Sequence, residues 1–343
     1  MTDAVELAQR LAALLESGRR VATYKLATLL ALIDTCAEAE QPPASSQPFP
    51  VSILELADRV IDLYWPQVRP YYDLGTLRQS TQHKAIVLDA VAELRSREAS
   101  PAAVRAEYPS TYHRSRRRVA HTLAKQPLPA LQTLGSTGRV RTPFLYDDSW
   151  LSYGITLQEL ERREWQLHLL PGVADGLVRL AGLLRPAIER AWTDDVASLN
   201  GVDREYQDLP LFLFGADRSS LVRAGRALLE LEGATCFYCG STIRHSDMNV
   251  DHFLPWARVP FNRLANLVLA DVRCNTSKSD ALASLQHLER WRNRDKAALE
   301  VVGADIRWPA EWDRSQRLAR GLYGRLPAGT PLWSASGAYE LTA

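Results

Sequence analysis

The sequence predicts an α+β protein, with a mostly helical N-terminal region, a small unit of two strands and a helix, and a helical or irregular C-terminal tail. Over the first two thirds of the 343 residues, apolar side chains recur at spacings of three and four, the period of an amphipathic helix. Later, apolar runs at 248–254 and 266–272 have the length of strands and are compatible with a hairpin. Residues 276–285 then predict a helix. Helices and strands are thus segregated along the chain, as in the α+β class.

In the helical region, apolar periodicity, capping residues and prolines indicate where helices begin and end. Residues 4–40 predict one or two helices. Ser52 can cap the next helix, and Glu55 three residues later completes the sequence of a capping box. The long helix 173–199 contains Pro186, which we expect to kink it. The other expected helices are 76–97, 115–125, 155–163 and 219–231, and the expected short strands are 139–146 and 165–170.

The composition is that of a folded chain, long enough for two domains or for one domain with a large elaboration. Hydrophobic residues make up 46% of it and charged residues 24%. We divide the chain into a helical region at 1–200, a domain at 201–300 with its core at 236–285, and an extension at 301–343. The extension is rich in tryptophan, which is seldom exposed at such density, so we expect it to pack on the protein.

The charge of the chain is balanced overall but uneven along the sequence. With 41 basic and 40 acidic residues, the net charge of +1 implies no partner by itself. Segment 101–141, however, contains eight basic residues and a single acid, Glu107. It forms either a solvated helix face or a surface for phosphates. The residues that we expect to contact nucleic acid there are Arg114, Arg116, Arg117 and Arg118.

The first twenty residues alternate apolar and charged side chains and therefore do not resemble a signal peptide. No run approaches the ~20 apolar residues that span a bilayer. We expect a cytoplasmic protein with no membrane partner.

The four cysteines favour a metal site over disulfides. Cys236, Cys239 and Cys274 fall within 39 residues, which is typical of a metal site in a reducing compartment. Cys36 lies alone in an apolar helical pattern, and we expect it to be a buried small hydrophobe.

Cys236 and Cys239 have the spacing at which two thiolates bind one tetrahedral zinc ion. Cys274 supplies a third ligand. The fourth is Asp271, which stands where a second Cys-x2-Cys pair would have its first cysteine, or else His245. The alternative is a degenerate site in which packing has replaced the metal.

Asp251 and His252 are the pair that can carry chemistry. As neighbours on an extended strand they would point to opposite sides, and a bend near Pro255 would let both reach one cleft. Taken alone, such a pair is usually structural, so its surroundings decide.

Those surroundings resemble the HNH (ββα-metal) endonuclease family. The family pattern is Asp-His at the end of the first strand, Asn fourteen residues after the His, and His or Asn nine residues later. His252, Asn266 and Asn275 lie at these separations, beside Cys-x2-Cys and Cys-Asn-x2-Lys elements. The resemblance covers about 50 of the 343 residues. Asn275 replaces the commoner third His, which makes this an HNN variant with a zinc knuckle.

The resemblance implies a one-metal phosphodiesterase. His252 would be the general base, and Asn266 would hold its loop. Asp251 and Asn275 would be oxygen ligands of a catalytic Mg²⁺ or Mn²⁺ ion, whereas the cysteines select a structural Zn²⁺. Two basic residues, Lys278 and Arg273, would contact phosphate.

The resemblance also implies a biological setting. Bacterial proteins of this build are often restriction or anti-phage defence nucleases, so residues 1–200 would recognise DNA or another defence-system protein. One HNH unit has one active site, so double-strand cutting would need a homodimer or two successive nicks. The alternatives are a catalytically inactive zinc-knuckle module that binds nucleic acid, and an RNA-directed nuclease.

Overall fold

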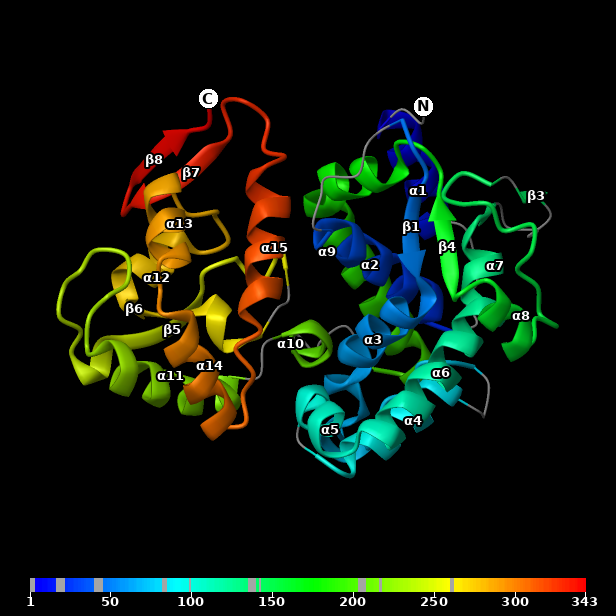
Figure 1. Cartoon of the computed structure of the whole chain (residues 1–343), viewed down its shortest axis with the longest axis horizontal. Helices are drawn as coiled ribbons and strands as arrows, with labels where there is room; N and C mark the ends of the chain where they lie inside the picture. Colours follow the sequence, from blue (N-terminus) through cyan, green and yellow to red (C-terminus); the bar gives the residue numbers. More distant parts are fainter. Residues whose placement is uncertain are drawn as a thin grey trace. The chain divides into compact units, whose positions relative to one another are not determined.

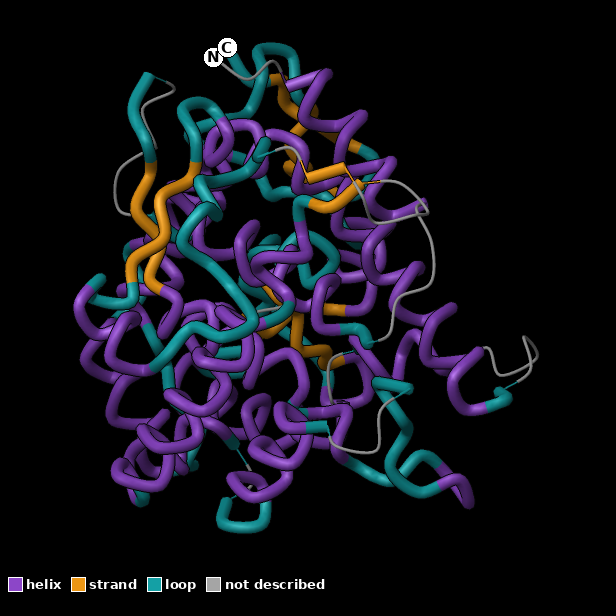
Figure 2. Tube along the Cα trace, turned by 90° about the vertical axis from the view of Figure 1, so that its right-hand side faces the viewer, coloured by secondary structure: helices purple, strands orange, loops and turns teal. Residues whose placement is uncertain are grey.

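The structure, a computed structural model, describes residues 4–16, 22–39, 46–81, 85–98, 100–134, 140–141, 143–202, 208–215, 218–259 and 262–343. The chain forms two compact units, Met1–Gly215 and Ala216–Ala343, each with its own hydrophobic core. Figure 1 colours them along the sequence, and Figure 2 shows how far helix predominates over strand. The predicted α+β class, with a mostly helical N-terminal region, is confirmed.

The first unit is a bundle of helices with two short antiparallel strand pairs. The strand pairs are β1 (Phe49–Ser52) with β4 (Gln166–Leu169), and β2 (Thr133–Leu134) with β3 (Val140–Arg141). The helices are α1 (Ala4–Glu16), α2 (Tyr24–Ala37), α3 (Ile53–Tyr64), η1 (Pro66–Val68), η2 (Tyr72–Leu74), α4 (Ile86–Arg95), α5 (Pro101–Glu107), α6 (Pro109–Lys125), α7 (Pro127–Leu131), α8 (Leu157–Arg162), α9 (Val173–Asn200) and α10 (Leu209–Phe214).

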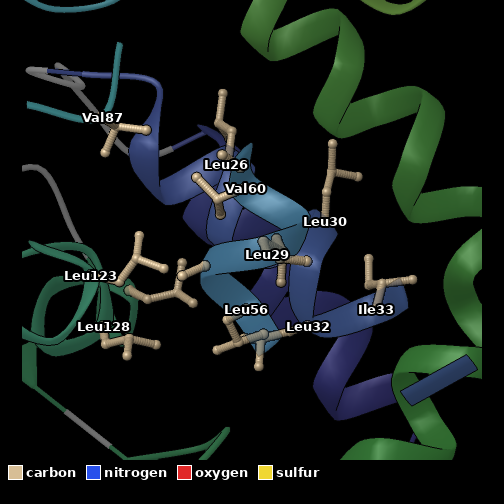
Figure 3. Close-up of a cluster of buried hydrophobic side chains, with 14 of the residues drawn as sticks. Leu26, Leu29, Leu30, Leu32, Ile33, Leu56, Val60, Val87, Leu123 and Leu128 are labelled. Atoms are coloured by element: carbon tan, nitrogen blue, oxygen red, sulfur yellow. The ribbon is translucent and has the colours of Figure 1, made fainter. Parts of the chain in front are cut away.

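Helix α2 lies at the centre of this unit, because nearly its whole surface is apolar and buried. It packs on α3, α7 and α9. Figure 3 shows Leu29 and Leu32 of α2 in one cluster with Leu56 of α3 and Leu123 of α6. Each fully buried leucine contributes about 2 kcal/mol of transfer free energy, so this cluster is a main source of the unit's stability.

The helix ends of the first unit agree with the sequence in part. Ser52 caps α3, since its Oγ accepts a bond from Glu55 N at 3.4 Å. Helix α9 continues through Pro186 to Asn200. The helix expected at 76–97 begins only at Ile86, because the carbonyl of Gln79 is instead bonded by Thr23 N at 3.0 Å.

The strand expected at 139–146 is reduced to β3. The backbone N–H groups of Phe144, Leu145 and Tyr146 all donate to the Gln132 side-chain oxygen, and this segment joins β4 by an isolated bridge between Tyr146 and Leu169 instead of pairing as a strand. Positions 139 and 142 of the expected strand lie outside the described residues.

The second unit is built on an antiparallel hairpin of β5 (Met248–His252) and β6 (Leu267–Asp271), in which Met248 pairs with Asp271 and His252 with Leu267. Its other elements are α11 (Arg218–Glu232), η3 (His245–Asp247), η4 (Leu264–Asn266), α12 (Val272–Lys278), α13 (Leu285–Arg292), α14 (Lys296–Asp305), α15 (Trp312–Tyr323), β7 (Pro331–Ala335) and β8 (Ala338–Leu341). Helix α11 packs on the hairpin closely, because Gly225 has no Cβ to meet Val250.

The helix that follows the hairpin is α12, and the predicted range 276–285 was wrong at both ends. It begins directly after β6, because the Asp271 carboxylate accepts a bond from Cys274 N at 2.8 Å and caps it. It ends at Lys278, since Ser279 has a φ of 48° and cannot continue a helix.

The C-terminal tail packs on the second unit. Backbone N–H groups of Leu264 and Ala265 donate to the carbonyls of Pro309 and Ala310, each at 3.2 Å. Strand β7 bonds the chain on both sides of Ala283 through Trp333, which is buried. Within the described residues, every helix is too short or too polar to traverse a lipid bilayer.

Candidate functional site

The hairpin and α12 bring Asp251 and Lys278 together inside the second unit. Lys278 Nζ lies 2.9 Å from Asp251 Oδ2 and also donates to the His252 carbonyl at 3.0 Å. Tyr238 OH donates to the same Oδ2 at 2.6 Å. Among the residues that the structure describes, no hydrogen bond ends on Asp251 Oδ1. The bonds that hold Asp251 thus all meet at one carboxylate oxygen.

Lys278 is placed differently from what the sequence suggested. Its side chain is fully buried, and burial lowers the pKa of its ammonium group although Asp251 opposes the effect. A lysine in this position neutralises Asp251 from within the fold, and its ammonium group is not presented on the surface. Removing one member of such a buried pair typically costs about 3–5 kcal/mol, because the other charge is left buried and unpaired.

His252 ends β5 and is buried, with 7% of its surface exposed. Its Nε2 lies 3.2 Å from Asn262 Oδ1, and its ring lies 5.1 Å from that of Trp256. Burial lowers the pKa of the imidazole, against the effect of the Asn262 bond. An amide oxygen is an acceptor, so this contact favours the tautomer with the proton on Nε2, in which Nδ1 is the basic atom.

Asn266 closes the loop that follows His252. It is completely buried, its Oδ1 accepts from Leu254 N at 2.9 Å, and its Nδ2 donates to Leu254 O at 3.2 Å. A further bond joins Phe253 N to the Asn266 carbonyl at 2.8 Å. These three bonds fix the backbone directly after the histidine.

Asn275 and Arg273 both lie on α12. Asn275 is half-buried and precedes Lys278 by three residues, so the two share one side of the helix. That spacing is compatible with the predicted role of Asn275 beside Asp251. Arg273 is exposed.

Cys236, Cys239, Asp271 and Cys274 lie together, with all four ligand atoms within 4.8 Å of one another. Cys239 Sγ lies 3.1 Å from Asp271 Oδ2. Burial, followed by the Asp271 carboxylate, raises the pKa of Cys274, and burial also raises that of Cys236. Three sulfurs and a carboxylate at this spacing suit zinc, which would convert the thiols to thiolates. The alternative ligand His245 has a side chain outside the described residues.

Some arginines of the basic segment 101–141 make contacts within the first unit. Arg116 bonds Asp58 at 2.8 Å and the Leu54 carbonyl at 3.2 Å, both on α3. Arg117 pairs with Glu161 and lies over the Trp165 ring. Arg114 and Arg118 are exposed on α6. Arg116 and Arg117 are thus engaged within the unit, and contact of the four arginines with nucleic acid stays a prediction.

Sequence reasoning missed Tyr238 and Asn262. Tyr238 lies between the two knuckle cysteines, where any aromatic residue would have predicted only packing. Burial, followed by Asp251, raises the pKa of its hydroxyl well above the ordinary value, so it remains a donor. Asn262 precedes Asn266 in a loop, and no regular spacing connects it to His252.

Comparison with known proteins assigns both parts of the chain to families. Residues 4–208 match a family described as a domain of unknown function (DUF8808), and residues 236–284 match the HNH endonuclease family. A curated relative, the CRISPR-associated endonuclease Cas9 of Actinomyces naeslundii, is 34% identical over 111 residues. That match covers 32% of this chain and 10% of the relative, so the chain spans only a tenth of its length. No solved structure matches the chain significantly.

The HNH match begins at Cys236 and ends at Ser284, so it includes the knuckle, the hairpin and α12. The other match covers more than half of the chain and lies within the first unit. The chain therefore belongs to the DUF8808 family, and its second unit carries a zinc-knuckle HNH endonuclease domain.

Proposed function

We propose that the protein is a divalent-ion-dependent endonuclease that hydrolyses phosphodiester bonds of DNA. The observation that carries the proposal is the arrangement at the end of β5. There a buried histidine, bonded through Nε2, follows an aspartate bonded through Oδ2; among the described residues no hydrogen bond is made by the other ring nitrogen or the other carboxylate oxygen, and the motif of a nuclease family surrounds both.

In this proposal His252 Nδ1 takes a proton from the attacking water, for which a neutral imidazole is required. Asn262 holds the ring through Nε2, and Asn266 holds the backbone behind it. Asp251 and Asn275 would bind Mg²⁺ or Mn²⁺ through oxygen. Such an ion, when bound, stabilises the negative charge that develops on the phosphate and the leaving oxygen.

Zinc in the cluster of Cys236, Cys239, Asp271 and Cys274 would have a structural role, since all four positions of a tetrahedral ion are filled by protein. Arg273, exposed on α12, would contact the nucleic-acid backbone beside the site. The exposed Arg114 and Arg118 would do so on the first unit.

The relative from Actinomyces naeslundii supports a role in bacterial defence, since its description names a CRISPR-associated endonuclease. We extend this setting to the chain, with DNA as substrate and another defence-system protein as partner. One catalytic centre per chain cuts one strand at a time, so a monomer should nick DNA and a homodimer could cut both strands.

The test is incubation of supercoiled plasmid with the purified chain and Mg²⁺ or Mn²⁺. We expect nicked circles, and we expect His252→Ala to reduce the rate at least a hundredfold, the usual weight of a general base. His168→Ala is the matched control, because His168 is exposed on β4 of the first unit and should leave the rate unchanged. Equal cutting by the His252 variant would remove this residue from the mechanism.

The same assay separates the alternatives. Turnover of RNA but not of DNA would transfer the mechanism to an RNA nuclease. Tight binding of DNA without turnover under any divalent ion would favour a zinc-knuckle binding module.

A further inference from the structure

Tyr238 links two parts of the second unit that could otherwise act separately. Its backbone belongs to the knuckle, between Cys236 and Cys239, and its hydroxyl reaches β5 to donate to Asp251 Oδ2 at 2.6 Å. The side chain is buried, with 3% of its surface exposed. It is thus a direct connection between the cysteine cluster and the carboxylate that we assign to the catalytic ion.

The phenol has little freedom of its own. Its ring packs edge-on against Trp333 at 5.2 Å and against His287 at 5.4 Å between ring centres. Lys278 Nζ lies 5.7 Å from the centre of the same ring. In this enclosure the hydroxyl can move only if the knuckle backbone moves.

The knuckle backbone is in turn held by the cluster. Phe237 N donates to the Leu269 carbonyl at 2.8 Å, which ties the knuckle to β6. Gly240 N donates to the Cys236 carbonyl at 2.9 Å, which closes the turn. Cys236 N donates to the Ser241 carbonyl at 2.8 Å, and Arg290 Nη1 donates to the carbonyls of Phe237 at 2.6 Å and Tyr238 at 3.1 Å. A further restraint is the meeting of Cys236 and Cys239 with the side chains at the start of α12. Zinc bound by all four side chains would join the two cysteines of the turn to β6 and α12 more firmly than their mutual hydrogen bonds do, so its loss should loosen the turn.

The position of Asp251 decides whether it can bind an ion. Tyr238 and Lys278 both hold Oδ2, the lysine from α12 and the tyrosine from the knuckle. Two bonds from different elements fix the plane of a carboxylate, whereas one bond leaves it free to rotate about that contact. The orientation of Oδ1 therefore depends on both.

We propose that Tyr238 is a positioning residue that couples the two metal sites. Zinc in the cysteine cluster fixes the knuckle, the knuckle fixes the phenol, and the phenol orients Asp251 so that Oδ1 faces the catalytic ion. Loss of zinc should then weaken binding of that ion although none of the zinc ligands contacts it. This inference rests on the proposed function, because it takes Asp251 as a ligand of the ion.

The first experiment measures Mn²⁺ affinity of the full chain by the electron paramagnetic resonance signal of free Mn²⁺, without nucleic acid. Tyr238→Phe removes only the hydroxyl. We expect about tenfold weaker Mn²⁺ binding, the lower end of the effect of such outer-shell partners, with the zinc content unchanged. Tyr323→Phe is the matched control. Its hydroxyl donates to the Ala283 carbonyl at 2.9 Å, so its loss should leave Mn²⁺ affinity unchanged.

The second experiment tests the coupling. Cys239→Ser should lower the zinc content and weaken Mn²⁺ binding in the presence of Tyr238. In the Tyr238→Phe background it should add little, since the connection is already cut. Wild-type Mn²⁺ affinity in Tyr238→Phe would overturn the proposal, as would independent, multiplicative losses in the double variant.

The results also show whether the proposed function or the coupling of the two metal sites has failed. A wild-type chain that binds Mn²⁺ and shows the coupling but cuts neither DNA nor RNA would contradict only the nuclease. A wild-type chain that binds no Mn²⁺ would overturn both proposals.

Discussion

Asp271 combines two roles in one side chain. Its Oδ1 accepts from Cys274 N at 2.8 Å as the cap of α12, and its Oδ2 faces Cys239 Sγ at 3.1 Å. A cysteine here would offer zinc a softer ligand but would cap the helix poorly. The substitution of carboxylate for thiolate is therefore compatible with a zinc site and stabilises the helix that carries Asn275.

The two roles should separate by substitution. Asp271→Asn keeps a good capping oxygen but removes the charge, so we expect loss of zinc with a small change in the stability of the zinc-free protein. Asp271→Ala should lose zinc and, in addition, about 1 kcal/mol of the free energy of unfolding. Zinc content and denaturant unfolding of the zinc-free variants measure the two effects.

The matched control is Asp295, which caps α14 by accepting from Ala298 N at 3.0 Å and is far from the cysteines in sequence. Asp295→Ala should cost a similar free energy while leaving zinc content unchanged. If Asp271→Asn retained zinc as the wild type does, the carboxylate would not be a ligand.

At the scale of single residues, the sequence predicted which cysteines meet but not which side chains of the site are buried. The spacing of the cysteines predicted that Cys236, Cys239 and Cys274 would meet, and they do. The burial of Lys278 could not be predicted, because a lysine in the last turn of a helix is ordinarily solvated. Its position follows from the pairing of β5 with β6 beneath α12, a tertiary arrangement that no local pattern records.

At the scale of elements, the hairpin was predictable and the boundaries of α12 were not. Strands of alternating or continuous apolar character are visible in sequence, and β5 and β6 fall within the predicted runs. The start of α12 depends on a cap that also belongs to the cysteine cluster. Its end depends on Ser279, whose φ of 48° a serine adopts only under tertiary constraint.

The strained end of α12 gives a prediction about stability. Ser279→Gly should raise the stability of the second unit by about 1 kcal/mol, because glycine adopts positive φ without the steric cost of a Cβ. Ser279 is exposed, so no packing is lost. Thermal unfolding measures the change.

Ser336→Gly is the comparison within the same unit, since Ser336 is exposed and is not among the residues with positive φ. It should lower stability slightly, through the greater freedom of glycine in the unfolded chain. Equal destabilisation by both substitutions would show that Ser279 is unstrained.

At the scale of the whole molecule, each unit has its own core, and the second extends well beyond its HNH segment. The match ends at Ser284, but Trp333 packs on Tyr238 and donates through Nε1 to Ser277 Oγ at 3.0 Å. Glu311, which directly precedes α15, accepts a bond from Arg263 Nε at 2.5 Å. Arg263 in turn directly precedes η4, the short helix that ends in Asn266. The tail therefore completes the unit that holds the site.

This support should be visible in the pH dependence of stability. Burial alone would raise the pKa of Glu311, but Arg263 and Arg314 together lower it to about 2, from an ordinary value of 4.5. A depressed pKa contributes stability that is fully present above the unfolded value and is lost as pH falls through the folded one. As pH falls from 4.5 to 2, protonation of Glu311 should thus lower the unfolding free energy of the wild type by about 3 kcal/mol. Glu311→Gln lacks this contribution at every pH, so its unfolding free energy should not show the same fall.

The measurement is the unfolding free energy of both proteins across this range, with Asp313→Asn as control. Asp313 pairs with Lys296 at 2.9 Å in solvent, where an ion pair contributes little, so its variant should follow the wild type. Parallel curves for wild type and Glu311→Gln would mean that the ion pairs of Glu311 do not stabilise the unit.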